Sequence, residues 1–398
     1  MGLSLNHAIR TARTYRLLAA VSLLWFLVQF LRFVFPPLFE TFQSSYGVSN
    51  TQTGVLFSLL MLSYAAVQLP AGLLGDQLGL STVVFAGAAV FSGSALLAAA
   101  SPSFLFVTFA AMLIGVGTGP HKTVAIPLLS GRYADHPGRA LGVMDTVGQL
   151  GGMTAPIAVV ALTGVFAWRS VFLLGAVASA ALASVFYWTV RADRSIEAVG
   201  IRGDRAPEPS EDDPSYRSVF ADRTFLAFVL VTVCFTFAWN GVASFLPLYL
   251  TVEKGLSTGA AGLLYSLLFA MTFSQTITGE LGDRGGRLTV SAALFATMGV
   301  GLGGLLLADS FLALGAVTVV VGVGFHGFRP VRDAYLMEVI PESVGGGTLG
   351  GVRTLMTGIG ALSPATIGVL SDAVGFRPAF GLVGGTVALA GLVTLSLR

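Results

Sequence analysis

The sequence predicts an all-α membrane protein whose twelve transmembrane helices form two pseudo-symmetric six-helix bundles. Three observations support this prediction. First, 54% of the 398 residues are hydrophobic and only 11% are charged, whereas soluble domains carry roughly 25% charged residues. Second, apolar segments long enough to cross a bilayer recur along the whole chain. Third, the second half of the sequence repeats motifs of the first half at a nearly constant offset.

Each predicted helix is an apolar segment bounded by turn residues or charges. A helix needs about 20 mostly apolar residues to cross a bilayer. The longest segments exceed this length, so turn signals such as Gly47–Asn50 and Ser101–Ser103 must divide them. The segments are continuously apolar rather than alternating, which argues against a β-barrel. The predicted helices are 17–39, 52–74, 80–100, 103–129, 139–164, 168–190, 223–250, 257–279, 287–308, 310–333, 345–371 and 376–396.

The distribution of basic residues predicts the orientation of the chain. Fifteen of the 22 Lys and Arg residues fall in tails and loops on the side of the N-terminus, and three (Arg169, Lys254 and Arg377) fall in loops on the other side. Because cytoplasmic loops are rich in Lys and Arg, both termini are expected in the cytoplasm and the chain in the cell membrane. The apolar run after Arg16 is too long for a signal peptide, so it is expected to remain as the first helix.

One long polar stretch, 191–222, divides the chain. It carries three prolines and the acidic run Glu211–Asp213, a composition typical of a linker. The predicted domains are therefore an N-terminal six-helix bundle at 1–190, a cytoplasmic linker at 191–222 and a C-terminal six-helix bundle at 223–398. Two such bundles can enclose a pathway between them, so we expect a monomer.

Several functional classes find no support in the sequence. A net charge of +2 gives no basis for nucleic-acid binding, and the single Cys234 excludes a Cys-rich metal site. Gly117–Thr123 resembles a phosphate-binding loop, but His121 stands where the pattern requires Gly before Lys122. We therefore expect no cofactor, no metal and no ATPase domain, and no nucleophile–base pair suggests an enzyme.

A loop motif occurs three times. Gly72–Gly79 recurs as Gly279–Gly286 at an offset of 207, and Pro156 recurs as Pro364 at an offset of 208. A third copy, Gly368–Arg377, falls on the opposite side of the predicted membrane. This pattern indicates inverted three-helix repeats within each half, an architecture associated with alternating access around a midplane site.

Through these motifs, its twelve spans and its central loop, the chain resembles the major facilitator superfamily of secondary transporters. Gly279–Arg287 matches the family signature Gly-x-Leu-x-Asp-Arg-x-Gly-Arg, whereas the first copy has Gln77, Leu80 and Ser81 where basic residues are usual. The resemblance implies that this loop latches the two halves in the outward-open state. The gating candidates in this loop are Asp76, Asp283, Arg284 and Arg287.

Ionisable residues inside the predicted spans are few, and most are basic. Such groups are costly in a bilayer and usually face a cavity or a partner. With histidine neutral, the set has four positive charges and one negative charge. A positive cavity attracts anions, which Arg recognises through its forked guanidinium. The set consists of Arg32, His121, Lys122, Asp145, His326, Arg329 and Arg353.

The resemblance implies that helices 1, 4, 7 and 10 line a central cavity, and that helices 4, 5, 10 and 11 meet at a cytoplasmic gate. Arg32 on the first helix is then the leading contact for a substrate anion, unless it snorkels to the outer interface. Lys122, Arg329 and Arg353 become cavity or gate residues. Asp145, taken as the one acid well inside a span, is predicted to pair with one of these three when the inner side is closed, or to form a static pair.

Other polar and aromatic residues complete the set of candidates. His121 and His326 could carry protons for coupling or gating, or pack as hydrogen-bonded histidines. The remaining substrate candidates could equally be packing or lipid-facing residues; they are Gln29, Tyr64, Gln68, Trp239 and Asn240. The run from Tyr64 to Gly72 also resembles anion-transporting branches of the superfamily.

The sequence therefore predicts a secondary active transporter of a small organic or inorganic anion, driven by a proton or counter-anion gradient. One alternative is a proton-coupled efflux pump for drugs or metabolites. It is disfavoured because Ala111 stands where the family often carries Arg, and Ala155 where antiporters carry Gly before Pro156. The other alternative is a transporter-like membrane receptor, which would be expected to carry a signalling domain.

Overall fold

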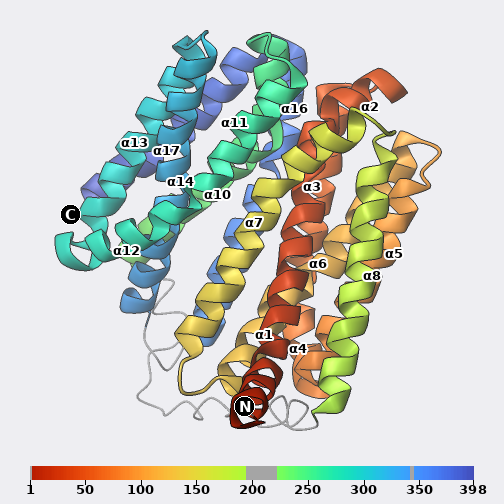
Figure 1. The fold of residues 1–398 in the computed structure, drawn as a ribbon. Helices are drawn as coiled ribbons and strands as arrows, with labels where there is room; N and C mark the ends of the chain where they lie inside the picture. Colours follow the sequence, from red (N-terminus) through yellow and green to blue (C-terminus); the bar gives the residue numbers. More distant parts are fainter. Residues whose placement is uncertain (1, 194–221, 341–344) are drawn as a thin grey trace.

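The computed structural model describes residues 2–193, 222–340 and 345–398, with the backbone alone for 2–14 and 345–350. Across these residues, twelve helical segments are long and apolar enough to cross a membrane. They form two bundles that lie side by side (Figure 1). The all-α membrane fold is thereby confirmed. Most of the predicted linker, with Glu211–Asp213, lies outside the described residues, so the predicted domain boundaries stay a prediction.

Several spans consist of two or three consecutive helical pieces. The elements of the first bundle are α1 (Gly2–Phe33), the 3-10 turn η1 (Pro36–Leu38), α2 (Phe39–Tyr46), α3 (Asn50–Ala66), α4 (Gln68–Leu78), α5 (Leu80–Ala99), α6 (Phe104–Arg132), α7 (Pro137–Thr163) and α8 (Arg169–Ala192). Those of the second are α10 (Arg223–Leu248), the π-helical turn η3 (Tyr249–Glu253), α11 (Thr258–Ala270), the 3-10 turn η4 (Met271–Phe273), α12 (Ser274–Gly285), α13 (Arg287–Leu307), α14 (Phe311–Val339), α15 (Gly345–Gly360), α16 (Ser363–Val374) and α17 (Phe376–Ser396).

Proline accounts for two of the breaks within spans. Pro70 has no N–H to donate to the carbonyl of Ala66, and α3 gives way to α4 between these two residues. Pro364 stands in the same relation to Gly360, at the break between α15 and α16. The first break adjoins the cavity described below, because Tyr64, which precedes it, lines that cavity.

The helix α14 (Phe311–Val339) is longer than predicted. It was expected to end at 333 but continues to Val339. The apolar pattern persists beyond Arg332 and Asp333, since Leu336 is buried and Tyr335 and Val339 pack against the core. Arg332 and Asp333 therefore lie well inside a span, and the prediction that Asp145 is the one acid there is wrong.

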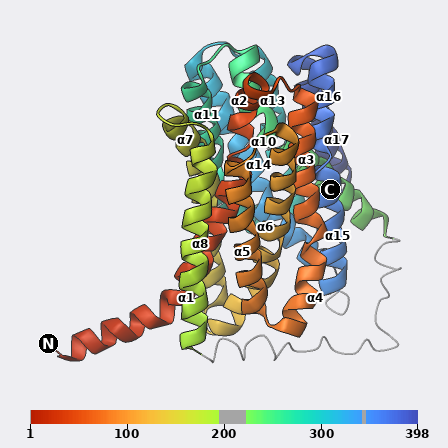
Figure 2. The same ribbon diagram turned by 90° about the vertical axis from the view of Figure 1, so that its right-hand side faces the viewer.

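The two faces of the membrane fold are marked by glycine turns. One face bears the start of α1 and the turns at Gly79 and Gly286, and we call it the terminal face (Figure 2). The other bears the turns at Gly47 and Gly375 and is called the opposite face. Gly79, Gly286 and Gly375, which belong to the three motif copies, have φ of 89°, 83° and 90°, a backbone that favours glycine.

At the opposite face, Asp372 joins the two bundles. Its carboxylate accepts hydrogen bonds from the backbone N–H of Asn50 at 3.1 Å and of Thr51 at 2.8 Å, and from the Thr51 hydroxyl at 2.6 Å. These N–H groups belong to the first turn of α3, where they lack helical partners and carry partial positive charge. The third copy of the loop motif thus caps a helix of the other bundle.

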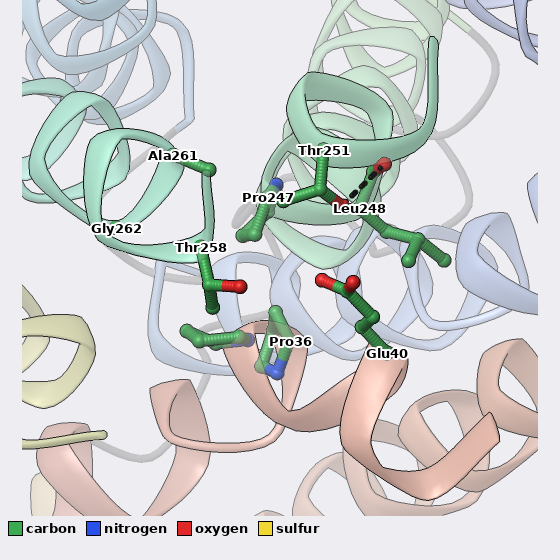
Figure 3. A pocket seen from close by; sticks show the side chains of 9 residues that line it. Pro36, Glu40, Pro247, Leu248, Thr251, Thr258, Ala261 and Gly262 are labelled. Carbon is green, nitrogen blue, oxygen red and sulfur yellow. Dashed lines mark hydrogen bonds between the residues drawn. The ribbon is translucent and has the colours of Figure 1, made fainter. Parts of the chain in front are cut away.

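Close backbone approach completes the closure of this face. A Cβ at Gly54 would lie 2.3 Å from the Pro364 carbonyl oxygen, and one at Gly368 would lie 2.4 Å from that of Asn50, so α3 and α16 meet through small residues. Beside them, η1, α2, α10, η3 and α11 leave a gap of only about 10 Å³ that Glu40 faces (Figure 3), roughly the space for one water.

We predict that Gly368→Leu separates the bundles at the opposite face, because the new side chain needs the space of the Asn50 backbone. Spin labels at the exposed Ser45 and Leu307, in a Cys234→Ser background, should report a longer distance by double electron–electron resonance. The control is Gly381→Leu, where a Cβ meets nothing within 4 Å. A folded Gly368→Leu variant with the parental distance would contradict the prediction.

Candidate substrate-binding cavity

A cavity of about 540 Å³ lies between the two bundles. The first bundle contributes residues of α1, α3, α6 and α7, and the second contributes residues of α10, η4, α12, α14 and α15. A second cavity of about 470 Å³ also borders Tyr64, Lys122 and Asp333, and reaches Gly72 and Arg353. The space therefore continues from the middle of the fold toward the terminal face, whereas the opposite face is closed.

Arg32 of α1 is a cavity residue, 7% exposed. Its guanidinium lies 4.0 Å from the ring centroid of Tyr64 and donates to Gln29 Oε1 and to Met61 Sδ, both at 3.2 Å. Its Nε has no hydrogen-bond partner within the described structure. The side chain is thus held toward the cavity, and the alternative that it snorkels to the outer interface does not fit this geometry.

Arg329 of α14 occupies a comparable position in the second bundle. Its guanidinium lies 4.6 Å from the ring centroid of Trp239 on α10, and both residues line the cavity. Among the described residues, no carboxylate lies within 4.0 Å of either Arg32 or Arg329. Each bundle therefore presents one arginine that stacks on an aromatic ring and has no acidic partner.

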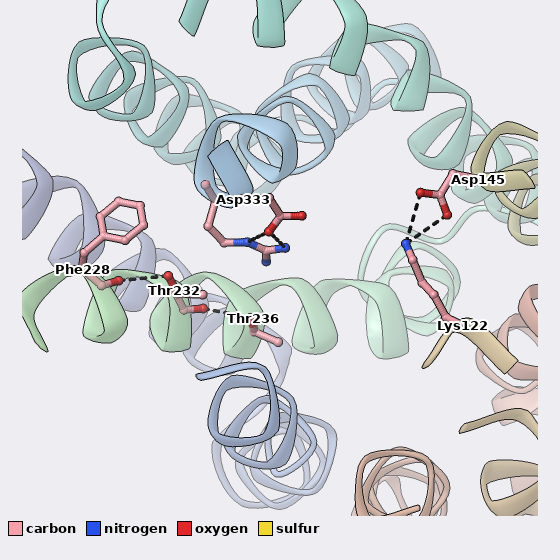
Figure 4. Close-up of polar contacts among 7 residues, drawn as sticks. Lys122, Asp145, Phe228, Thr232, Thr236 and Asp333 are labelled. Carbon is pink, nitrogen blue, oxygen red and sulfur yellow. Dashed lines mark hydrogen bonds and ion pairs between the residues drawn. The ribbon is translucent and has the colours of Figure 1, made fainter. Parts of the chain in front are cut away.

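The other two basic residues of this cavity, Lys122 and Arg332, each form an ion pair with an aspartate of the same bundle. Lys122 Nζ lies 3.0 Å from one carboxylate oxygen of Asp145 and 3.2 Å from the other, within the first bundle. Arg332 pairs with Asp333 at 2.7 Å within the second bundle. Figure 4 shows Asp333 and the Lys122–Asp145 pair on different helices around one space. Closure of the terminal face is not needed for the Lys122–Asp145 pair, which fits the static alternative for Asp145.

The described residues of the two cavities keep a net charge of +3. Their five bases are Arg32, Lys122, Arg329, Arg332 and Arg353, and their two acids are Asp145 and Asp333. Adding Arg332 and Asp333 to the sequence-derived set leaves its excess of positive charge unchanged, because the two charges cancel.

The two candidate histidines do not line the described cavities. His121 is 2% exposed, with Nε2 3.1 Å from the Val21 carbonyl oxygen and its ring stacked on Trp25. His326 is fully buried against the rings of Trp239 and Phe269. His121 matches the packed, hydrogen-bonded alternative, whereas neither ring nitrogen of His326 has a hydrogen-bond partner within the described structure. A role of either histidine in coupling or gating stays a prediction.

The signature-loop candidates lie at the terminal face. Arg287 donates to Glu338 Oε2 at 2.8 Å and lies 3.6 Å from Asp283, so the loop is tied to α14. Arg284 pairs with Glu280 at the surface, and Asp76 is exposed. The ion pairs described for this loop lie within the second bundle, and the gating role of all four candidates stays a prediction.

The remaining candidates divide between the two cavities. Gln29, Trp239 and Asn240 line the larger one, Gln68 and Arg353 line the smaller one, and Tyr64 borders both. Several lining residues were not among the candidates. Arg332 and Asp333 were not selected because the predicted helix ended there. Trp25, Gln149 and Thr236 also line the cavity, but they carry no charge that would distinguish them in the sequence.

The chain belongs to the Major Facilitator Superfamily, whose family model matches residues 21–273 and 229–398. It is similar to a probable sulfoacetate transporter, SauU, of Cupriavidus necator, with 24% identity over 88% of this chain and 86% of the relative. A hexuronate transporter of Bacillus subtilis shares 24% identity over 89% and 87%.

The fold matches the crystal structure of a bacterial homologue of the human lysosomal transporter Spinster, with a TM-score of 0.80 and 16% identity over 97% of both chains. Family, relatives and fold together define a multi-pass membrane transporter of small solutes.

We predict that reversing the charge of Lys122 or of Asp145 alone lowers transport, and that exchanging the two residues restores it. Lys122→Asp or Asp145→Lys alone replaces an ion pair of 3.0 Å by two like charges, which should lower solute uptake by roughly tenfold. The double exchange should recover most of the uptake into proteoliposomes. Exchange of Asp145 with Arg353, which are not paired here, serves as the control. Equal loss in the single and double Lys122–Asp145 variants would contradict this prediction.

Proposed function

We propose that this transporter carries a small organic anion, which Arg32 binds in the central cavity. The observation that carries the proposal is the buried Arg32 guanidinium without a carboxylate partner among the described residues. An uncompensated charge inside a membrane protein is costly. A substrate anion that enters the cavity would supply the missing partner through charge-assisted hydrogen bonds.

Two further observations support an anion. The cavities carry a net charge of +3 on the described residues, and such a field attracts anions and repels cations. The relatives named for sulfoacetate and for hexuronate transport carry anionic solutes. The efflux of cationic drugs, the main alternative, would place a positive solute beside Arg32 and Arg329.

We place the terminal face in the cytoplasm because it carries most of the loop Lys and Arg residues. In this orientation, the cavity continues inward, and solute exchange with the outside requires the Asp372 contacts to α3 to break. Alternating access between these states would carry the anion across.

Charge balance favours exchange against a second anion over proton symport. An empty cavity that closes on both sides would enclose three uncompensated positive charges, and protonation of Asp145 or Asp333 would add to them. A returning counter-anion reduces this excess.

We predict that Arg32→Gln abolishes anion binding. Arg32→Lys should retain only a small fraction of the binding, since Lys keeps the charge but loses both the forked guanidinium and its contact with the Tyr64 ring. Binding is measured as a ligand-induced rise in Tm for purified protein, and transport as uptake of labelled sulfoacetate and glucuronate into liposomes.

Arg191→Gln, which removes an exposed cation on α8, is the matched control and should behave like the parent. Unchanged anion affinity in a folded Arg32→Gln variant would refute the role of Arg32. Uptake of cationic drugs without uptake of any anion would refute the proposed function.

A further inference from the structure

We propose that the substrate is a dianion whose two acidic groups bind Arg32 of the first bundle and Arg329 of the second at the same time. This inference rests on the proposed anion transport and adds the number of charges and the second binding residue. It follows from the way in which the cavity charges are compensated.

The charged residues of the larger cavity fall into two groups. Lys122 and Arg332 are each neutralised by an aspartate of their own bundle, at 3.0 Å and 2.7 Å. Arg32 and Arg329 have no such partner among the described residues, so two positive charges remain, one on each bundle. A monoanion can neutralise only one of them, whereas a dianion neutralises both.

The two arginines present their charges in a similar way. Arg32 stacks on Tyr64 at 4.0 Å and Arg329 on Trp239 at 4.6 Å, measured from the guanidinium carbon to the ring centroid. A guanidinium that lies over an aromatic ring keeps its N–H edge for other partners. Arg32 donates from this edge to Gln29 and Met61, and its Nε has no partner within the described structure, so an anion can accept from Nε. Both arginines line one cavity. Arg329 feels the repulsive charges of Arg332 and Arg32 and the attractive charges of Asp333 and Asp145, although neither carboxylate lies within 4.0 Å of it.

The volume of the cavity limits the size of the dianion, and its uncharged polar residues offer further hydrogen bonds. About 540 Å³ is suitable for a small organic acid. The buried Oε1 of Gln149 in this lining has no hydrogen-bond partner within the described structure, so it can accept from a hydroxyl group of the substrate. Asn240 and Thr236 add polar groups from the second bundle.

Bridging has a mechanical consequence. In the empty cavity, the two arginines push the bundles apart, and a dianion between them converts this repulsion into attraction. Because Arg32 and Arg329 belong to different bundles, ligand binding changes the relative stability of the open and closed arrangements. A monoanion bound at Arg32 alone would leave the charge of Arg329 uncompensated.

The test compares dianions with half-amides of the same shape. Purified protein is titrated calorimetrically with malonate and malonamate, succinate and succinamate, phthalate and phthalamate, and with sulfoacetate. We expect the tightest-binding diacid to bind at least about tenfold more tightly than its half-amide, the scale of one charged hydrogen-bonded contact.

Arg329→Gln should bring that diacid and its half-amide to within about threefold of each other. Arg329→Lys should keep part of the preference, and Arg32→Gln should bind neither ligand. Arg191→Gln should match the parent. Gel filtration and the Tm of the unliganded protein establish that each variant is folded.

Two results would overturn the inference without touching the proposed function. In the first, binding depends on Arg32 but the half-amides bind with the same affinity as their diacids. In the second, the Arg329→Gln variant still binds the diacid more tightly than the half-amide. If none of the acids binds to the parent protein, the proposed function fails, and the inference fails with it.

Discussion

A charge enclosed in a membrane protein needs a partner, and this constraint organises the cavity. Lys122 and Arg332 have aspartate partners within their own bundles. Arg32 and Arg329 instead stack on Tyr64 and Trp239, which lowers the cost of burying a cation but leaves its charge uncompensated. In the proposed function, an anion supplies the missing partner for these two arginines, and this role connects the few charges of the sequence to transport.

The two faces of the molecule hold the bundles by different forces. At the opposite face, Asp372 caps α3 across the bundles, and Gly368 lets the backbones meet. These contacts are attractive and independent of a ligand. Around the cavity, by contrast, the unpaired arginines repel each other. A solute that neutralises the arginines removes their repulsion but leaves the contacts at the opposite face unchanged. It therefore shifts the relative stability of the two arrangements, as alternating access requires.

The sequence predicts the fold well because apolar length, loop charge and the 207–208 offset are one-dimensional patterns. Arg32 and Arg329 could also be found, since a charge within an apolar segment is conspicuous. The partner of Asp145 stayed open among three bases because distances between helices depend on packing. Asp333 was missed because a charged residue near a predicted helix end was taken as its boundary. Trp25 and Gln149 could not be predicted as cavity residues, because uncharged residues of these types in a span are as compatible with helix packing as with a cavity.

The compensated pairs also influence the cost of moving between states. Lys122–Asp145 and Arg332–Asp333 each lie within one bundle, so they can stay neutral while the bundles rotate. Lys122 and Arg353 act electrostatically on Asp333, so these groups can also share partners when the terminal face closes. Among the charged residues that line the larger cavity, Arg32 and Arg329 are the two without an ion-pair partner in the described structure. Under the proposed anion transport, the empty carrier would face a higher electrostatic barrier than the loaded one. This barrier would suppress futile cycling and favour exchange of one anion for another.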